Sequence, residues 1–314
     1  MTAHIKAVWS HWSNPLLTTR WSGWPTFRHY LVSFVLSHGL ACQHGYRTIL
    51  ITDTAGRDLL VDGIQIPFDD VRLDLEDLRH YHPSLWNSGK VLAYGLQSEP
   101  FIHLDNDVYL WEPLPVQLTS APLFAQNPEF AIEQPEYYRI SELESLITGQ
   151  DGATLPTEWQ WCRGLLGDYQ RSFNTGIFGG VRFDFIQHYS IMFLKLARFL
   201  SSQSEFIQSP HSRRHAGTLE MLLPGMLVDY HRGNPGSPFR DTRMETLFPT
   251  PEAAYLSGES HSYTHLLGDS KRKPGTLRRL DLRVQREYPK EYARCEEYAD
   301  YLNNNRDTTA HQTR

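Results

Sequence analysis

The stretch Phe101–Trp111 (FIHLDNDVYLW) constrains the fold most, because it places two acidic residues inside a strongly apolar segment. Burying the carboxylates of Asp105 and Asp107 within a sheet is costly unless positive charge neutralises them. We therefore expect the pair where a buried strand leaves the carboxyl edge of an open α/β sheet, the edge at which such folds bind ligands. The two carboxylates would be neighbours there, and a divalent cation is their natural partner. The alternative is an ordinary turn, because Asp and Asn favour turns.

The segments before this stretch predict a parallel sheet. A first strand is predicted over His4–Trp12, an amphipathic helix over Phe27–Gln43 and a second strand over Arg47–Thr52. Strand, helix and strand with brief connections form a βαβ unit, which implies a parallel sheet with a right-handed crossover. Further elements are predicted at Ile64–Phe68 (strand), Asp74–His82 (helix) and Leu85–Gln97 (helix).

The chain after the acidic pair gives weaker signals. The region Gln126–Leu166 is aromatic and irregular. Two stretches, Gln126–Thr157 and Trp159–Tyr169, form either a lid or acceptor platform, or the ordinary packing of an inserted segment. Arg171–Arg182 (RSFNTGIFGGVR) predicts a strand, and Asp184–Ser201 predicts a helix. The remaining predicted elements are a helix at Thr218–Leu227 limited by Pro224, a strand at Tyr263–Leu267 and a charged helix at Leu277–Tyr301.

Composition narrows the class of protein. With 314 residues, of which 40% are apolar, the chain can bury a large core as one extended α/β domain or as one domain with an appendage. A net charge of -6 without a long basic run argues against a nucleic-acid polymer as partner. The three distant cysteines predict neither a disulfide framework nor a zinc cluster. We see no signal peptide and no apolar stretch near the roughly 20 residues that span a bilayer, so we expect a cytoplasmic protein without a transmembrane segment.

Two later stretches carry further candidate residues, Phe173–Gly176 (FNTG) and His265–Lys271 (HLLGDSK). His265 ends a short apolar strand, and Lys271 follows it across Gly268, which permits a close backbone turn. A diphosphate held on a divalent metal needs such a set: a metal ligand, backbone approach through glycine, and a cation at the phosphate oxygens. The alternative is a strand, a turn and a solvated basic run, because two more basic residues follow.

Together the DxD pair, the FNTGIFGG stretch and HxxGxxK followed closely by Pro274 resemble the GT-A glycosyltransferases. Within them the likeness is greatest to the branch of glycogenin and the bacterial lipopolysaccharide galactosyltransferases. The three elements occur in the same order, over roughly Ala7 to Pro274. The sequence departs from that branch because two residues separate Lys271 from Pro274, and the tryptophan that follows the lysine-proline pair in the family is absent.

The resemblance implies an α/β fold of the Rossmann-like, nucleotide-diphospho-sugar transferase type, with a mixed, mainly parallel central sheet. The GT-A-like domain would span residues 1–274. A C-terminal helical extension over 275–302 and a disordered polar tail over 303–314 would follow it.

The resemblance also implies the site residues and the cofactor. Asp105, Asp107 and His265 would hold Mn²⁺ (or Mg²⁺), and mixed oxygen and imidazole ligation favours Mn²⁺. The other implied contacts are Gly268 and Lys271 with the diphosphate, Asn174 with the sugar, Lys90 with the donor, Ser10 and Trp12 with the nucleobase, and Glu220 as the nearest match to a catalytic acidic residue. The alternatives are a solvated helix lysine for Lys90, a core residue for Trp12 and a helix-surface residue for Glu220.

These residues predict a metal-dependent, hexosyltransferase-like glycosyltransferase that moves a sugar from a nucleotide-diphosphate sugar to an unknown acceptor, which would be a sugar, a peptide or a small molecule. The alternative is a non-catalytic nucleotide- or sugar-binding module on the same scaffold. A nucleotidyltransferase that makes the activated sugar is a third possibility. Such enzymes usually carry a glycine-rich basic loop after the first strand, which Ser13–Leu16 does not resemble.

Overall fold

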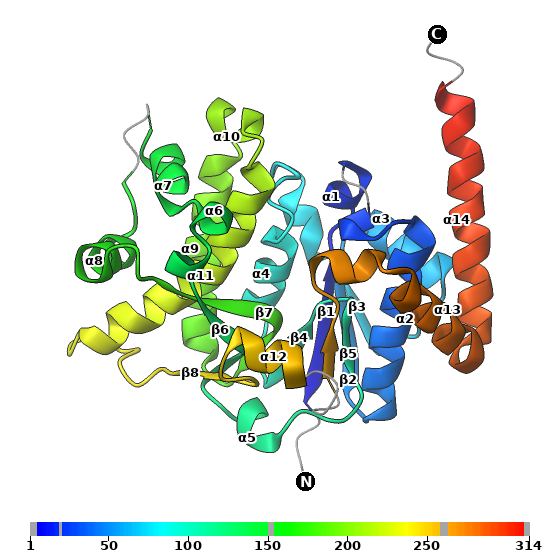
Figure 1. The fold of residues 1–314 in the computed structure, drawn as a ribbon, viewed down its shortest axis with the longest axis horizontal. Coiled ribbons are helices and arrows are strands. Elements are labelled where there is room, and N and C mark those ends of the chain that lie inside the picture. Colours follow the sequence, from blue (N-terminus) through cyan, green and yellow to red (C-terminus); the bar gives the residue numbers. More distant parts are fainter. Residues whose placement is uncertain (1–4, 19–20, 150–153, 258–262, 311–314) are drawn as a thin grey trace.

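The computed structural model describes residues 5–18, 21–149, 154–257 and 263–310. Within these residues the chain forms a seven-stranded central sheet with helices on both faces and a separate two-stranded sheet (Figure 1). In spatial order the central strands are β3 (Asp70–Arg72), β2 (Arg47–Thr52), β1 (Lys6–His11), β4 (Phe101–Leu104), β7 (Arg171–Gly180), β6 (Leu123–Phe130) and β8 (Met244–Thr246).

The central sheet is mixed but mainly parallel. Strand β7 runs antiparallel to both of its neighbours, whereas the other neighbouring pairs of this sheet are parallel. This arrangement confirms the predicted α/β class with a mixed, mainly parallel sheet. The division into a domain over 1–274 and a helical extension stays a prediction.

Both faces of the sheet are buried. Val8 and Ile51 belong to one hydrophobic core, whereas their strand neighbours Trp9 and Leu50 belong to the other. Successive side chains of a strand point to opposite faces, so a strand covered on both sides must be apolar at every position. This requirement explains why the strands appear in the sequence as continuous apolar runs.

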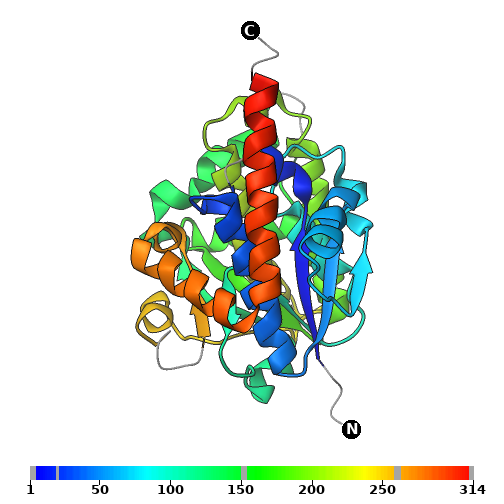
Figure 2. The same ribbon diagram turned by 90° about the vertical axis from the view of Figure 1, so that its right-hand side faces the viewer.

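Two sets of helices cover these faces (Figures 1 and 2). On one side lie α4 (Ser88–Gly95), α9 (Phe183–Leu200) and α11 (Ser212–Gly233). On the other lie α2 (Phe27–Gln43) and α13 (Pro274–Glu287), and α14 (Pro289–Ala310) packs along the outside of α2. The other α-helices described are α1 (Ser13–Thr18), α3 (Thr54–Arg57), α5 (Val116–Thr119), α6 (Pro135–Tyr138), α7 (Ile140–Thr148), α8 (Thr157–Leu166), α10 (Ser204–Gln208) and α12 (Pro251–Ser257).

Several predicted elements are confirmed. Helix α2 and strand β2 have the predicted bounds, and β1 lies within the predicted first strand, of which His4 is outside the described residues. Helix α2 begins after Thr26, whose hydroxyl oxygen accepts a hydrogen bond from the His29 backbone N–H at 3.2 Å. Such a cap satisfies one of the amide groups that a helix start leaves unpaired.

The predicted strand at Ile64–Phe68 is wrong, because the third strand is β3 at Asp70–Arg72. A π-helical turn occupies Asp58–Gly63, Gln65 adopts a φ of 63°, and Pro67 has no N–H to donate to a strand partner. The predicted helix at Asp74–His82 is a shorter 3₁₀ helix at Asp74–Leu78.

The region Gln126–Leu166 is more regular than predicted, since it continues β6 and contains α6, α7 and α8. Strand β6 pairs with β7 along most of its length, and this pairing supplies the order that the local sequence does not show. Trp159 is fully buried and its Nε1–H donates to Glu144 Oε1 at 2.7 Å. This burial supports the packing interpretation of Trp159 over that of an acceptor platform.

Two helices extend past their predicted ends. Helix α11 continues through Pro224 to Gly233, and packing on β7 and α8 outweighs the roughly 3 kcal/mol that proline costs inside a helix. Helix α14 continues to Ala310, past residue 303 where the sequence predicts a disordered tail, and residues 311–314 lie outside the described part.

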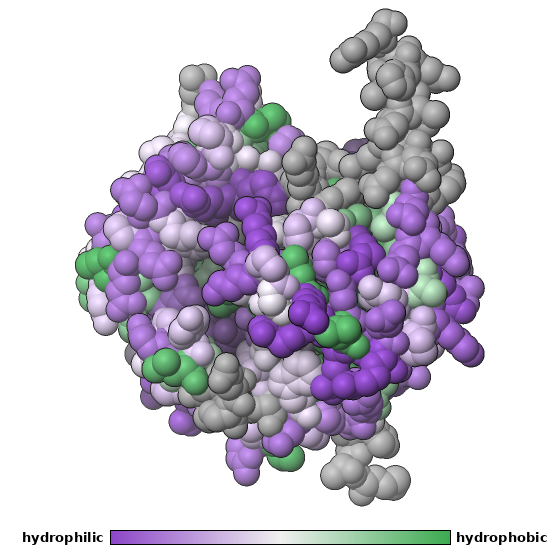
Figure 3. All heavy atoms as spheres, turned by 45° about the vertical axis from the view of Figure 1, so that its right-hand side comes forward, coloured by the Kyte–Doolittle hydropathy of each residue, from purple (hydrophilic) through white to green (hydrophobic). Residues whose placement is uncertain are grey.

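The visible surface is mostly hydrophilic. The face drawn in Figure 3 carries small, separate hydrophobic patches among polar side chains. In the part of the chain that the structure describes, none of the helices combines the length and the apolar character that crossing a membrane requires.

Candidate functional site

The acidic pair lies at the carboxyl end of β4, as predicted. The Asp105 N–H donates to the Gly176 carbonyl of β7 at 3.0 Å, and the Val108 N–H donates back to the Asp105 carbonyl at 3.0 Å. Strand β5 (Val108–Leu110) begins directly after this turn. The Asp107 side chain is only 6% exposed, and that of Asp105 is 24% exposed. The segment is therefore a turn that also presents two carboxylates.

A short strand from the far end of the chain brings His265 to this turn. Strand β9 (Tyr263–His265) pairs antiparallel with β5, with His265 opposite Val108. The pairing places His265 Nε2 3.5 Å from Asp107 Oδ1. It is continued by the Leu266 N–H, which donates to the Asp107 carbonyl at 3.0 Å. The register between β5 and β9, each three residues long, thus brings His265 next to Asp107 although the two are far apart in the sequence.

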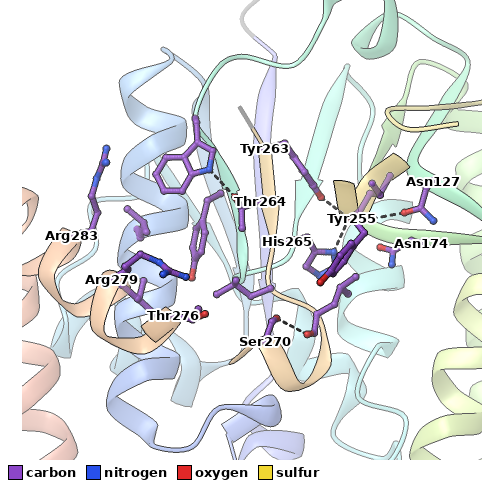
Figure 4. A pocket seen from close by; sticks show the side chains of 18 of the residues that line it. Asn127, Asn174, Tyr255, Tyr263, Thr264, His265, Ser270, Thr276, Arg279 and Arg283 are labelled. Carbon is purple, nitrogen blue, oxygen red and sulfur yellow. Dashed lines mark hydrogen bonds between the residues drawn. The ribbon is translucent and has the colours of Figure 1, made fainter. Parts of the chain in front are cut away.

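The ring of His265 is held in one orientation. Its Nδ1 lies 2.7 Å from Gln126 Oε1, an amide oxygen that also accepts the Tyr263 hydroxyl at 2.7 Å (Figure 4). Because an amide oxygen only accepts, Nδ1 is the protonated nitrogen in this contact, and the neutral form of the ring would present the lone pair of Nε2 to a metal. A Cβ at Gly176 would lie 2.4 Å from His265 Nδ1, so only glycine leaves room for the ring.

The three groups fit a divalent cation. Ligand atoms of Asp105, Asp107 and His265 all lie within 4.8 Å of one another. Two carboxylates and one imidazole with its Nε2 lone pair free are a donor set that such an ion accepts. A ligating histidine usually donates its other ring N–H to an oxygen acceptor, and here Gln126 supplies that acceptor.

Positive side chains balance the two carboxylates in this structure. Burial by itself raises the pKa of Asp107, but the adjacent Lys271 and His265 outweigh it and hold that pKa below its ordinary value. Burial also raises the pKa of Asp105; Lys90 opposes this effect, and the charge of Asp107 adds to it. The negative charge of the two buried carboxylates is thus stabilised by the positive charge of neighbouring side chains.

Behind Asp105 lies a buried polar network. Lys90 Nζ on α4 is 2.8 Å from Asp105 Oδ1 and 3.0 Å from Glu220 Oε1 on α11. Thr175 donates its hydroxyl to Glu220 Oε1 at 2.6 Å, and Asn87 Nδ2 donates to Glu220 Oε2 at 3.1 Å. Lys90 is 5% exposed and Glu220 is 2% exposed, so neither is the solvated helix residue that the alternative interpretations describe.

The segment after β9 is a 3₁₀ helix over Gly268–Arg272 that begins with a φ of 49° at Gly268, a conformation that favours glycine. Lys271 makes an ion pair with Asp107, donates to the Ser22 carbonyl at 3.2 Å and lies 5.7 Å from the centre of the Trp24 ring. Of the predicted pair, Lys271 therefore contacts the acidic turn, and Gly268 begins the 3₁₀ helix that carries it.

A cavity of about 980 Å³ opens beside His265 (Figure 4). Asn174 lines it, accepts the Gly176 N–H at 3.1 Å through Oδ1 and lies 3.5 Å from Glu129 Oε1 through Nδ2. Residues of β6 that the sequence analysis missed also line it, namely Gln126, Asn127 and Glu129. The signal that would have found them is the apolar run 122–125 leading into polar residues, the same pattern that marks β4.

Ser10 and Trp12, at the end of β1, make their contacts away from the cavity. Ser10 Oγ lies 3.0 Å from His103 Nε2, and Trp12 is buried in the core beside α4. Neither residue lines the cavity. The burial of Trp12 favours its interpretation as a core residue, and contact of either residue with a nucleobase stays a prediction.

Comparison with known proteins places the chain in a family. The model of a family described as "Family of unknown function (DUF6734)" matches residues 3–298. The chain belongs to the DUF6734 family. The match ends within α14, so the family region includes both sheets and every candidate residue named above.

Other comparisons add little for this DUF6734 chain. A search of curated proteins finds no match. Among solved structures the chain is similar to the galactosyltransferase LgtC, crystallised in complex with donor and acceptor sugar analogues. The identity is 14% and the TM-score 0.33, over 69% of this chain and 71% of that chain. At this identity and TM-score the likeness carries no argument about activity.

Proposed function

We propose that the chain is a metal-dependent glycosyltransferase whose donor is a nucleotide-diphosphate sugar. The observation that carries the proposal is the meeting of Asp105, Asp107 and His265, whose ligand atoms lie within 4.8 Å of one another. Of the three, His265 also lines the cavity of about 980 Å³. Cavities of this size suit ligands with the dimensions of a nucleotide sugar. Mixed carboxylate and imidazole donors favour Mn²⁺ over Mg²⁺.

In this proposal Asp105, Asp107 and His265 would hold the metal. When bound, Mn²⁺ would supply positive charge at the diphosphate oxygens, where negative charge grows as the bond from the sugar to the leaving phosphate breaks. Lys271 would bind a phosphate oxygen of the same group. The positive φ of Gly268 would let the backbone of the 3₁₀ helix approach the diphosphate.

The remaining site residues would orient the reactants. Lys90 and Glu220 hold Asp105 in place from behind, because all three are joined by contacts of 3.0 Å or less. Asn174 and Glu129 line the cavity and would hydrogen-bond the hydroxyl groups of the transferred sugar. In this role Lys90 supports a metal ligand rather than contacting the donor itself.

The proposal is tested by ligand-dependent thermal unfolding. UDP or GDP with Mn²⁺ at about 100 times Kd stabilises a binding protein by about 2.7 kcal/mol, which is a Tm rise of about 5 °C for a chain of this size. Asp107→Asn should abolish the rise. The matched control is Asp77→Asn, the same change at an exposed position, which should keep it. A full rise in the Asp107→Asn protein would refute the metal site.

Transfer and simple binding are separated by donor hydrolysis. Incubation with labelled nucleotide sugars and Mn²⁺ needs no knowledge of the acceptor, because water replaces it. We expect release of labelled sugar from at least one donor, and loss of that release in Asp107→Asn. A Tm rise without any release above the buffer rate, across donors and candidate acceptors, would instead support the non-catalytic binding module.

A further inference from the structure

A second group of metal-ligating side chains lies where α8, α9 and α11 meet, the helices at the left of Figure 1. Glu158 lies near the start of α8, His188 lies on α9 and His231 lies near the end of α11. One carboxylate oxygen and one nitrogen from each ring lie within 4.8 Å of one another. These three residues have no part in the proposed glycosyl transfer.

The histidine rings leave polar atoms without partners. Nε2 of His188 and Nε2 of His231 are both buried and lack a hydrogen-bond partner among the described residues. An unsatisfied buried polar atom costs about 1–3 kcal/mol, so two of them on rings whose centres are 5.4 Å apart require an explanation. His231 is 7% exposed, which leaves water little access to its ring.

The other nitrogen of His231 is already occupied. Its Nδ1 lies 2.8 Å from Ser237 Oγ, which also accepts the Phe239 N–H at 3.0 Å. When Nδ1–H donates to this serine, Nε2 carries the lone pair that a metal requires. The arrangement repeats the one at His265, where Gln126 holds Nδ1 and leaves Nε2 free.

The separation of the ligand atoms also suits a metal. His188 Nε2 lies 3.6 Å from Glu158 Oε1, which is too long for a hydrogen bond. Ligand atoms about 2.0–2.2 Å from a tetrahedral ion are about 3.4 Å apart. The Phe239 ring lies 5.4 Å from the His188 ring and 5.0 Å from the His231 ring, so an apolar wall closes one side.

We propose that Glu158, His188 and His231 form a second metal site, which binds Zn²⁺. Two imidazoles and one carboxylate are a ligand set that zinc uses with three protein ligands and one open position, whereas the oxygen-rich acidic turn suits Mn²⁺. The ion would tie α8 to two core helices. The site contains no cysteine, and each ligand comes from a different helix. The ligands therefore form no short sequence motif by which the site could be predicted. The inference does not depend on the proposed glycosyl transfer.

The experiment measures zinc binding with the first site disabled. Isothermal titration with Zn²⁺ is carried out on the Asp107→Asn chain, and Glu158→Gln, His188→Gln and Ser237→Ala are each added to that background. His80→Gln is the matched control, since it makes the same change at an exposed histidine. Co²⁺ binding, followed by its visible absorption, reports the coordination geometry independently.

We expect one Zn²⁺ per chain in the parent and in the His80→Gln control. Glu158→Gln and His188→Gln should each weaken zinc binding by about 100-fold or more, and Ser237→Ala by about 10–100-fold. Should His188→Gln fail to fold, Glu158→Gln, a nearly isosteric change, still decides the question. The proposal is overturned if the parent binds no zinc, or if Glu158→Gln binds it as tightly as the His80→Gln control.

Discussion

Replacing Gly176 by alanine tests how tightly the candidate metal site is built without removing any ligand. Gly176 lies on β7 beside Asp105, and its backbone has no strained φ that would by itself exclude alanine. The new Cβ would lie 2.4 Å from His265 Nδ1 and 2.8 Å from Gln126 Oε1. The two side chains that hold the imidazole in place would therefore both have to move.

The size of the effect follows from these distances. Ordinary van der Waals contact begins at 3.4 Å, so the imidazole must retreat by about 1 Å. The distance from a ligand atom to its metal tolerates an error of only about 0.2 Å, and loss of the hydrogen bond that orients a ligand costs about 10–100-fold in metal affinity. We therefore expect the Gly176→Ala protein to bind Mn²⁺ about 10–100-fold more weakly than the wild type does. Overpacking should also lower the free energy of unfolding by about 1–3 kcal/mol.

The assay is Mn²⁺ titration by calorimetry, with urea unfolding of the same samples to measure stability. Gly164→Ala is the matched control, since nothing lies within 4 Å of its added Cβ, and it should leave Mn²⁺ affinity unchanged. A folded Gly176→Ala protein that binds Mn²⁺ with wild-type affinity would show that His265 is not a ligand held by this contact. It would refute the geometry on which the site rests.

Two further outcomes concern stability. Lys90→Met leaves Glu220 buried without its cation, and we expect a loss of about 3–5 kcal/mol in urea unfolding, partly restored in the double variant with Glu220→Gln; a loss below about 1 kcal/mol would contradict the buried pair. Burial lowers the pKa of His38 from 6.5 to about 4, although Asp69 opposes it. As pH falls, His38 therefore takes up a proton in the unfolded chain before it does so in the folded protein, and this favours unfolding. The free energy of unfolding should fall by up to about 3 kcal/mol between pH 6.5 and 4. His38→Gln should remove this share of the loss, while His11, whose pKa burial also lowers to about 4, still contributes its own. An unchanged pH dependence would show that His38 is not a source.

Local signals in the sequence sufficed for much of the fold. Three local patterns predicted buried segments that agree with the structure. They are the apolar period of α2, the apolar run of β2 and the strand that leads into Asp105. The prediction at Ile64–Phe68 failed because an apolar run does not reveal a positive φ at Gln65. Only the short apolar run 122–125 marks the start of strand β6 in the sequence, and its polar second half is ordered by pairing with β7, so the strand as a whole was missed.

The sequence by itself determined which residue types the site contains: an acidic pair after a buried strand, a histidine after a short strand, and a lysine beyond a glycine. Only the tertiary structure decided that these residues meet. The contact of His265 with Asp107 depends on the register between β5 and β9, and the pairing of Lys90 with Glu220 depends on how α4 and α11 pack around the sheet. Strands of three residues carry too little pattern to fix a register, and helix periodicity shows which face is buried without showing what lies opposite. The same reason hides the group formed by Glu158, His188 and His231, whose members share no segment of the chain.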